Sequence, residues 1–360
     1  MNFPDGAAIV FCEGAFGTPN GKTAHGLVRR TKRYTLLSVI DSTNAYRDAG
    51  ELLDGKTNDI PIYPSLQEAL IKAKNKGQNP THFVIGLAPD GGRLNQKHRE
   101  AVKLAIRAGL HIDSGLHDFL SDDPEFRQLA EKNRVSIRDI RMTPPRDKLH
   151  FFSGKIEMVT SLKVAVLGTD SAVGKRTTAW LLAEALQGSG LTAEFVGTGQ
   201  TAWMQGARYT LMLDSLINDF VSGEIEHAVW SAWNENHPDV IVIEGQGSLM
   251  NPAYPGGFEI LAAGRPDCVI LQHAPGRKEY DGFPGYPIHP IEVQIQAIEI
   301  ISGKPVCAIT INHENLAAHD IPDICTAISL QTSLPAVDVL RDGAGEVVKI
   351  LQSYLKISLS

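Results

Sequence analysis

The chain has 360 residues, of which 43% are hydrophobic and 21% are charged, and its formal net charge is −7 at pH 7. This length predicts about two domains, and the composition is that of an ordinary globular protein. The acidic balance disfavours DNA or RNA as the principal partner, because nucleic-acid-binding proteins are usually basic. No apolar run approaches the roughly 20 residues of a membrane helix, so we expect no membrane partner.

The four cysteines are widely scattered, without disulfide or zinc spacing, and the first residues lack the basic segment of a secretory signal. We therefore expect a cytoplasmic protein with no resident metal. Its expected partner is a small-molecule substrate, and we expect it to form a homo-oligomer.

Short apolar segments alternate with amphipathic ones in the N-terminal part of the chain, which predicts a parallel sheet with crossover helices. The expected strands are 7–14, 34–41, 81–88, 110–115 and 135–141, and the expected helices include 98–109 and 124–133. These elements predict a Rossmann-like domain over residues 1–145.

The first turn of this domain contains Gly14, Gly17 and Gly21, followed by Lys22 and Thr23. Its spacing fits neither a phosphate-binding loop nor the Rossmann fingerprint. Asp41 ends the second expected strand, where a dinucleotide fold places its ribose-binding carboxylate. A degenerate dinucleotide fold, an anion site at the turn and an NAD site all remain open.

A polar, proline-bearing stretch at 142–158 is expected to be a linker. Strands are then expected at 162–169, 192–199, 239–246, 267–274 and 306–312, and helices at 175–190 and 291–303. This alternation predicts a second, doubly wound parallel sheet over residues 146–360. Its ligand site is expected in the loops that follow the strands.

The segment VLGTDSAVGKRTTAWLL, residues 166–182, has the strand, glycine-rich turn and helix of a phosphate-binding loop. Backbone N–H groups in such a turn form a concave nest, the helix N-terminus adds partial positive charge, and lysine adds a full one. The residues expected to bind the phosphates are Gly168, Thr169, Asp170, Ser171, Ala172, Val173, Gly174, Lys175, Arg176, Thr177 and Thr178.

Two irregularities separate this loop from the usual NTPase loop. Five residues, rather than four, lie between Gly168 and Gly174, and Arg176 stands where the magnesium-binding hydroxyl normally follows the lysine. Thr177 and Thr178 come later, and one residue turns a helical side chain by about 100°. The extra cation suits a phosphate-dense ligand held without metal, such as coenzyme A.

The long loop and the segment VIVIEGQGSL, residues 240–249, resemble those of dethiobiotin synthetase. Together with GKTAHG at 21–26 and GTGQTAWM at 197–204, they resemble a family described as a domain of unknown function. That family has a Rossmann-like N-terminal half and a P-loop C-terminal half. Its characterised branch includes a D-glutamate N-acetyltransferase, so the resemblance implies acetyl transfer from acetyl-CoA to an amino-acid amine.

An amine that attacks a thioester needs a base, and the candidates are Glu244, Asp214 and His289. Groups that could bind the acceptor's carboxylates are Gln200, Thr201, Gln246 and Arg277, and Asn312 is placed to contact a purine. The alternative is an ATP- and magnesium-dependent ligase or kinase resembling dethiobiotin synthetase, with Asp170, Glu244 and Thr177 around the metal. A non-enzymatic sensor of nucleotide or coenzyme A is the third possibility.

Overall fold

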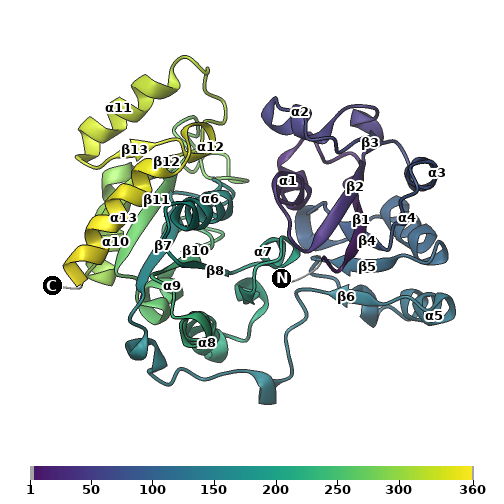
Figure 1. The fold of residues 1–360 in the computed structure, drawn as a ribbon, viewed down its shortest axis with the longest axis horizontal. Coiled ribbons are helices and arrows are strands. Elements are labelled where there is room, and N and C mark those ends of the chain that lie inside the picture. Colours follow the sequence, from purple (N-terminus) through teal and green to yellow (C-terminus); the bar gives the residue numbers. More distant parts are fainter. Residues whose placement is uncertain (1–3, 359–360) are drawn as a thin grey trace. The chain divides into compact units, whose positions relative to one another are not determined.

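The computed structural model describes residues 4–358, which divide into two compact units (Figure 1). The N-terminal unit consists of the chain up to Thr143 together with Gln200–Ala207, and the C-terminal unit contains Pro144–Gly199 and the chain from Arg208 onward. Each unit has its own parallel sheet with helices on both faces, which confirms the expected α/β class.

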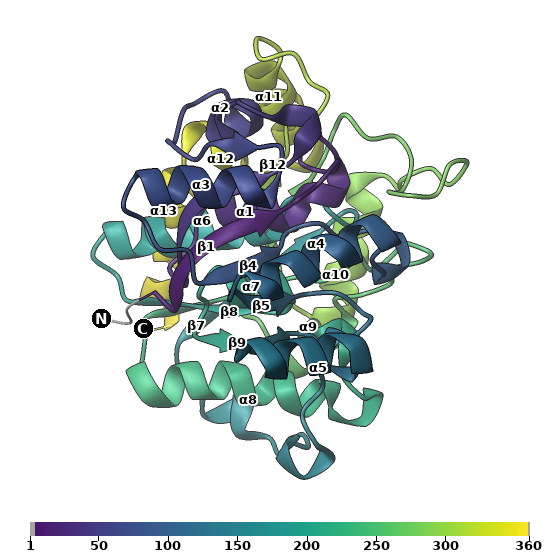
Figure 2. The same cartoon turned by 90° about the vertical axis from the view of Figure 1, so that its right-hand side faces the viewer.

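The N-terminal unit has a six-stranded sheet in the order β3-β2-β1-β4-β5-β6. Its strands are β1 (Gly6–Phe11), β2 (Tyr34–Ile40), β3 (Ile62–Tyr63), β4 (His82–Ile85), β5 (His111–Ser114) and β6 (Ile137–Asp139). Its helices are α1 (Lys22–Arg29), α2 (Ala49–Asp54), α3 (Leu66–Asn75), α4 (Gln96–Arg107) and α5 (Pro124–Asn133). Helices α3, α4 and α5 cover one face of the sheet (Figure 2).

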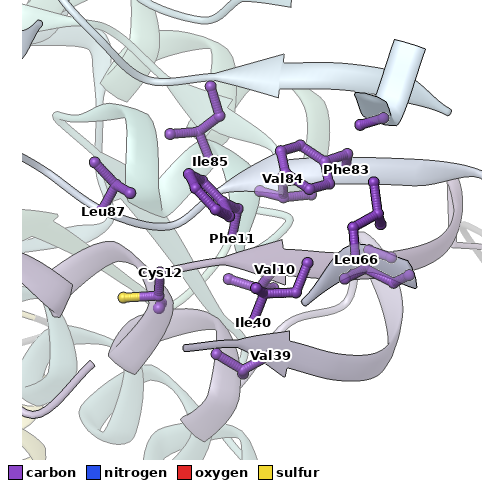
Figure 3. Packing of buried hydrophobic residues seen from close by; sticks show 14 of the residues in the cluster. Val10, Phe11, Cys12, Val39, Ile40, Leu66, Phe83, Val84, Ile85 and Leu87 are labelled. Atoms are coloured by element: carbon purple, nitrogen blue, oxygen red, sulfur yellow. The ribbon is translucent and has the colours of Figure 1, made fainter. Parts of the chain in front are cut away.

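The core of this unit forms where β1 pairs with β4. The rings of Phe11 and Phe83, labelled in Figure 3, lie side by side and stack. Their centroids are 5.2 Å apart. A Cβ on Gly86 would lie 2.5 Å from Val10 and 2.9 Å from the Cβ of Ala24. Glycine at position 86 therefore lets α1 pack directly against the sheet.

Asp41 holds the turn between β1 and α1. Its carboxylate is fully buried, and it accepts hydrogen bonds from the backbone N–H groups of Gly14 at 3.2 Å and Phe16 at 3.0 Å. The backbone N–H of Thr43 donates to the same carboxylate at 2.9 Å. The turn thus occupies the group that a dinucleotide fold would offer to a ribose, which leaves Asp41 with a structural role.

One short helix of the N-terminal unit comes from the middle of the C-terminal half. Helix α7 (Gln200–Met204) places Met204, which is fully buried, in the core of the N-terminal unit. The amide of Gln205 donates to the carbonyl of Gly26 at 2.8 Å, and the guanidinium of Arg33 lies 3.6 Å from the ring centroid of Trp203. The connection between two strands of one unit therefore supplies part of the other.

The C-terminal unit has a seven-stranded sheet in the order β13-β12-β11-β7-β10-β8-β9. Its strands are β7 (Leu162–Gly168), β8 (Ala193–Gly197), β9 (Tyr209–Thr210), β10 (Val240–Glu244), β11 (Cys268–His273), β12 (Val306–Ile311) and β13 (Ala336–Val337). Its helices are α6 (Lys175–Gly188), α8 (Asn218–Asn236), α9 (Phe258–Gly264), α10 (Ile291–Ser302), α11 (Ile321–Thr332), α12 (Val339–Asp342) and α13 (Gly345–Ser358).

Helices α6, α12 and α13 pack together, and α8, α9 and α10 form a second group (Figure 1). The linker before β7 is fixed to α8, because the buried carboxylate of Glu226 accepts hydrogen bonds from the backbone of Ser153 at 2.7 Å and Ile156 at 3.1 Å. Within residues 4–358, no helix has the length and apolarity to cross a membrane.

Candidate phosphate-binding site

The turn between β7 and α6 has the geometry of a phosphate-binding loop. A Cβ on Gly168 would lie 2.9 Å from Cδ of Lys175, so only glycine lets the lysine side chain fold back over the turn. Ala172 and Gly174 have φ values of +52° and +105°, in the left-handed region. These two residues reverse the chain, as in the turns whose successive N–H groups form anion-binding nests.

The turn forms a cationic cradle. Helix α6 begins at Lys175, and no side chain among the described residues caps its N-terminus. Nζ of Lys175 donates to the carbonyls of Asp170 and Gly247, each at 2.7 Å. The partial positive charge of the helix end therefore lies beside a full positive charge, as anion binding requires.

Asp170 accepts hydrogen bonds from several segments around this cradle. Its carboxylate is fully buried and accepts hydrogen bonds through both oxygens. Oδ1 accepts from the backbone of Ser171 and the side chain of Asn251, both at 2.7 Å. Oδ2 accepts from the backbone of Asp281 at 2.8 Å and from Nη1 of Arg277 at 3.0 Å. Protein donors thus occupy the carboxylate that the alternative enzyme would give to magnesium.

Arg277 binds the loop itself. Its guanidinium donates to the carbonyl of Ser171 at 2.8 Å and to that of Ala172 at 3.3 Å, and it also pairs with Glu314. Burial opposes the positive charge, but the hydrogen bonds to Glu314 and Asp170 raise the pKa of Arg277 above its usual value. The side chain that the sequence analysis expected to bind substrate therefore donates its hydrogen bonds to carbonyls of the loop.

Polar side chains below the loop tie it to the neighbouring strands. The hydroxyls of Thr178 and Thr310 both donate to Oε1 of Gln272, each at 2.5 Å. Nδ2 of Asn312 donates to the carbonyl of Val173 at 3.0 Å. Asn312, expected at a purine, therefore also supports the phosphate-binding turn.

Glu244 ends β10 and is 5% exposed. Its Oε2 accepts a hydrogen bond from the backbone N–H of Thr198 at 3.0 Å. Burial raises the pKa of this carboxyl, although the nearby charges of Arg176 and Lys175 and the hydrogen bond from Thr198 partly oppose that rise. A buried carboxyl within the electrostatic reach of the loop cations is the best placed of the three expected bases.

The other two expected bases are exposed. Asp214 lies in a short 3₁₀-helix, Leu213–Ser215, and its charge contributes to the raised pKa of Glu244. His289 lies in the loop before α10, where Nδ1 forms a 2.8 Å hydrogen bond with the hydroxyl of Tyr280.

Gln246, which the sequence analysis expected to bind substrate, lines a small hollow with Gly168 and Ser248.

Gln200 and Thr201, which the sequence places with the acceptor site, belong to the N-terminal unit. The hydroxyl of Thr201 lies 3.0 Å from that of Thr23, and both residues are buried. A Cβ on Gly115 would lie 2.5 Å from Cγ of Gln200, so glycine there makes room for α7. Both residues therefore contribute to the seating of α7.

Comparison with known families identifies the two halves. Residues 150–348 match the model of the DUF1611_C P-loop domain, and residues 42–143 match the DUF1611_N Rossmann-like domain. The chain belongs to the DUF1611 family. A crystal structure of a family member from Anabaena variabilis matches with a TM-score of 0.87 and 28% identity, over 96% of this chain and 99% of that one. The expected family and its two-domain organisation are confirmed.

Two curated relatives carry the name D-glutamate N-acetyltransferase. The protein from a Pseudoalteromonas species is 32% identical over 273 residues, which is 74% of this chain and 80% of the relative. The protein from Tritonibacter scottomollicae is 30% identical over 279 residues, 75% of this chain and 80% of the relative. Both of these relatives therefore carry a name that denotes acetyl transfer to an amine.

Proposed function

We propose that this protein transfers an acetyl group from acetyl-CoA to the amine of an amino acid, with D-glutamate as the first acceptor to test. The names of two relatives at about 30% identity support the N-acetyltransferase class. The observation that carries the acetyl-CoA part is the cradle in which Lys175 and the uncapped end of α6 lie beside the turn held by Arg277.

The chemistry of this cradle fits the nucleotide end of acetyl-CoA, which carries a pyrophosphate and a 3′-phosphate. Lys175 and Arg176 would balance the phosphate charge, and the N–H groups of residues 172–176 would donate to its oxygens. Acetyl-CoA supplies a thioester whose carbonyl carbon accepts the attacking nitrogen. The protein's contribution is to hold the phosphates and to receive a proton from the amine.

Glu244 is the proposed base. A carboxyl whose pKa is raised by burial takes a proton from nitrogen more readily at neutral pH than an exposed carboxyl does. Its position at the end of β10, within the electrostatic influence of Lys175 and Arg176, places it beside the cradle. Of the side chains expected to bind the acceptor's carboxylates, Gln246 is the proposed contact in the C-terminal unit, because it lines the hollow beside Gly168.

The geometry of Asp170 argues against the alternative ATP-dependent enzyme. Four protein donors, one of them the cation of Arg277, use both carboxylate oxygens, so a magnesium ion at Asp170 would have to displace them. Thermal unfolding with acetyl-CoA and with ATP plus magnesium, each with and without EDTA, separates the two functions. Bound ligand stabilises by RT ln(1 + [L]/Kd), so saturating acetyl-CoA should raise the Tm whether or not EDTA is present.

The opposite pattern would contradict the proposal. It consists of stabilisation by ATP plus magnesium that EDTA abolishes, together with no shift by acetyl-CoA at concentrations up to the millimolar range.

A further inference from the structure

Three aromatic rings from two loops form a continuous surface, and we call this set the aromatic bridge: Tyr254, Phe283 and Tyr286. Tyr254 lies in the loop after β10, whereas Phe283 and Tyr286 lie in the loop after β11. The ring centroid of Phe283 lies 6.3 Å from that of each tyrosine, at interplanar angles of 70° and 85°. The two tyrosines are 57% and 56% exposed, and no ring within residues 4–358 stacks parallel to either of them. Both tyrosine rings therefore leave planar apolar surface uncovered.

The aromatic bridge spans the end of β7. Strands β10 and β11 pair with opposite sides of β7, so the contact between Tyr254 and Phe283 crosses the line along which β7 continues into the phosphate-binding turn. Asp170 in this turn accepts hydrogen bonds from both loops. The side chain of Asn251 donates from the first loop at 2.7 Å, and the backbone N–H of Asp281 donates from the second at 2.8 Å. One buried carboxylate thus fixes both sides of the bridge to the turn.

Hydrogen bonds hold the backbone of both loops, so the aromatic bridge is formed before any ligand binds. The N–H of Tyr254 donates to Oδ1 of Asn251 at 2.8 Å, and its carbonyl accepts from the N–H of Ser248 at 3.1 Å. The carbonyl of Tyr286 accepts from the N–H of Tyr280 at 2.9 Å. Exposed rings scattered singly need no explanation, but three in contact on ordered loops mark a binding surface. Because the loops are already ordered, a planar ligand binds there at a small entropic cost.

The amide that the sequence offers to a purine is already in use. Nδ2 of Asn312 donates to the carbonyl of Val173 at 3.0 Å, and its Oδ1 accepts from the backbone N–H of Glu314 at 3.0 Å. Both ends of this side chain therefore hold loops, and recognition of a base falls to another part of the site. An aromatic ring can hold a base without any hydrogen bond, because every base has a π-face.

We propose that the aromatic bridge binds the adenine of coenzyme A by stacking the base on the ring of Tyr254, while the cradle holds the phosphates. This inference rests on the proposed use of acetyl-CoA. Nζ of Lys175 donates to the carbonyl of Gly247 at 2.7 Å, and a Cβ on Gly247 would lie 2.2 Å from the carbonyl oxygen of Tyr254. The backbone that carries the tyrosine thus lies against a residue that the cradle lysine contacts. A base can therefore reach the ring while its phosphates stay at Lys175.

Isothermal titration of the full chain with nucleotides tests this assignment. Tyr254→Leu keeps apolar bulk but removes the ring, and Tyr254→Phe keeps the ring. We expect the Leu variant to raise the Kd for coenzyme A and for adenosine 3′,5′-bisphosphate by roughly 5- to 100-fold, as when a stacked base loses its aromatic partner. Tyr254→Phe should bind with wild-type affinity. So should the control Tyr46→Leu, which removes a tyrosine that is 74% exposed in the N-terminal unit.

Two further readouts separate stacking from other effects. Inorganic pyrophosphate carries no base, so its Kd should be the same in wild type and in every variant. The etheno-adenine derivative of coenzyme A is fluorescent, and stacking on an aromatic ring quenches it. Binding to wild type should therefore quench this fluorescence, and binding to Tyr254→Leu should quench it less.

An unchanged Kd for both nucleotides in Tyr254→Leu would overturn the inference and leave the proposed function standing. Weaker binding of coenzyme A with unchanged binding of adenosine 3′,5′-bisphosphate would also overturn it, because the ring would then contact the pantetheine arm. An equal rise in the Kd for pyrophosphate would show that the substitution acts through the cradle, with the same consequence. Failure of the wild-type protein to bind coenzyme A would instead refute the proposed function, and this inference with it.

Discussion

Nη1 of Arg277 lies 3.0 Å from Oδ2 of Asp170 and 2.8 Å from the carbonyl oxygen of Ser171. An arginine from the loop after β11 thus holds both a buried carboxylate and the backbone of the turn after β7. Because the carbonyls of this turn point toward Arg277, its N–H groups can point toward the nest. Under the proposed function, this pair would influence phosphate binding through the shape of the turn, without Arg277 touching the phosphate.

Replacing Arg277 should weaken both the fold and ligand binding. Arg277→Met leaves the buried Asp170 carboxylate without its cation, and removing one partner of a buried pair costs about 3 kcal/mol in free energy of unfolding. Arg277→Lys keeps the charge but loses the fork that spans Asp170 and Glu314, so it should fall between Met and wild type. Urea unfolding and the Kd for acetyl-CoA measure the two effects. Equal stability of the Met variant and wild type would refute the role of the pair.

Lys175→Met should lower the affinity for acetyl-CoA and also reduce stability, because the carbonyls of Asp170 and Gly247 lose their donor. A hydrogen bond to a charged partner contributes roughly 1.5–3 kcal/mol, which corresponds to a Kd raised by about 10- to 100-fold. The matched control is Lys304→Met, which removes the same charge at an exposed position before β12. Isothermal titration with acetyl-CoA should separate the two variants, and a similar small change in both would show that only net charge matters.

Glu244→Gln should stabilise the protein while removing activity. Because burial raises the pKa of Glu244, its ionisation destabilises the folded state as pH rises through that pKa. Gln keeps the acceptor for the Thr198 N–H, so the variant should unfold at a higher temperature than wild type at pH 7. The gain should shrink as the pH falls toward the ordinary pKa of about 4.5.

Loss of the base should reduce kcat for the same variant by about 10²- to 10⁴-fold. Glu346→Gln, at an exposed position in α13, is the control for both measurements. A stability gain that grows toward acidic pH would contradict the assigned burial effect, and full activity would exclude Glu244 as the base.

Met204→Ala should destabilise the N-terminal unit, although residue 204 lies in the sequence of the C-terminal half. Met204 is fully buried in the core of that unit, and truncating such a side chain costs about 3 kcal/mol. Met158→Ala, at a position that is 55% exposed, is the control. For the same reason a fragment that ends at Thr143 should lack a cooperative unfolding transition. A stable, cooperative fragment would show that α7 is dispensable.

Strand and turn patterns predicted much of this fold. The long apolar runs at β1, β7 and β10 and the glycines around Lys175 are local signals, and the loop geometry follows from them. The two-residue strands β3, β9 and β13 were not expected, because they are too short to show a periodicity. Helix α7 was also missed as part of the N-terminal unit, since nothing local distinguishes it from an ordinary connection.

The partners of the site residues were the least predictable part. Asp170 and Arg277 are 107 residues apart in the chain, so no spacing relates them. A proline-rich loop after a strand was enough to place Arg277 near the ligand edge, but not to show that it binds loop carbonyls. The contact between the rings of Tyr254 and Phe283 likewise appears only when the loops after β10 and β11 are placed.

The measurement that tests the central claim most directly is thiol release from acetyl-CoA by the full chain, with D-glutamate and L-glutamate as separate acceptors. EDTA is included in these assays, N-acetylglutamate is identified by mass spectrometry, and ATP consumption is measured in a parallel assay that contains magnesium and no EDTA. We predict acceptor-dependent release of one thiol for each N-acetyl product, and a strong reduction in this release in Lys175→Met and Glu244→Gln. No release with either enantiomer or with other amino acids, together with magnesium-dependent consumption of ATP, would contradict the account.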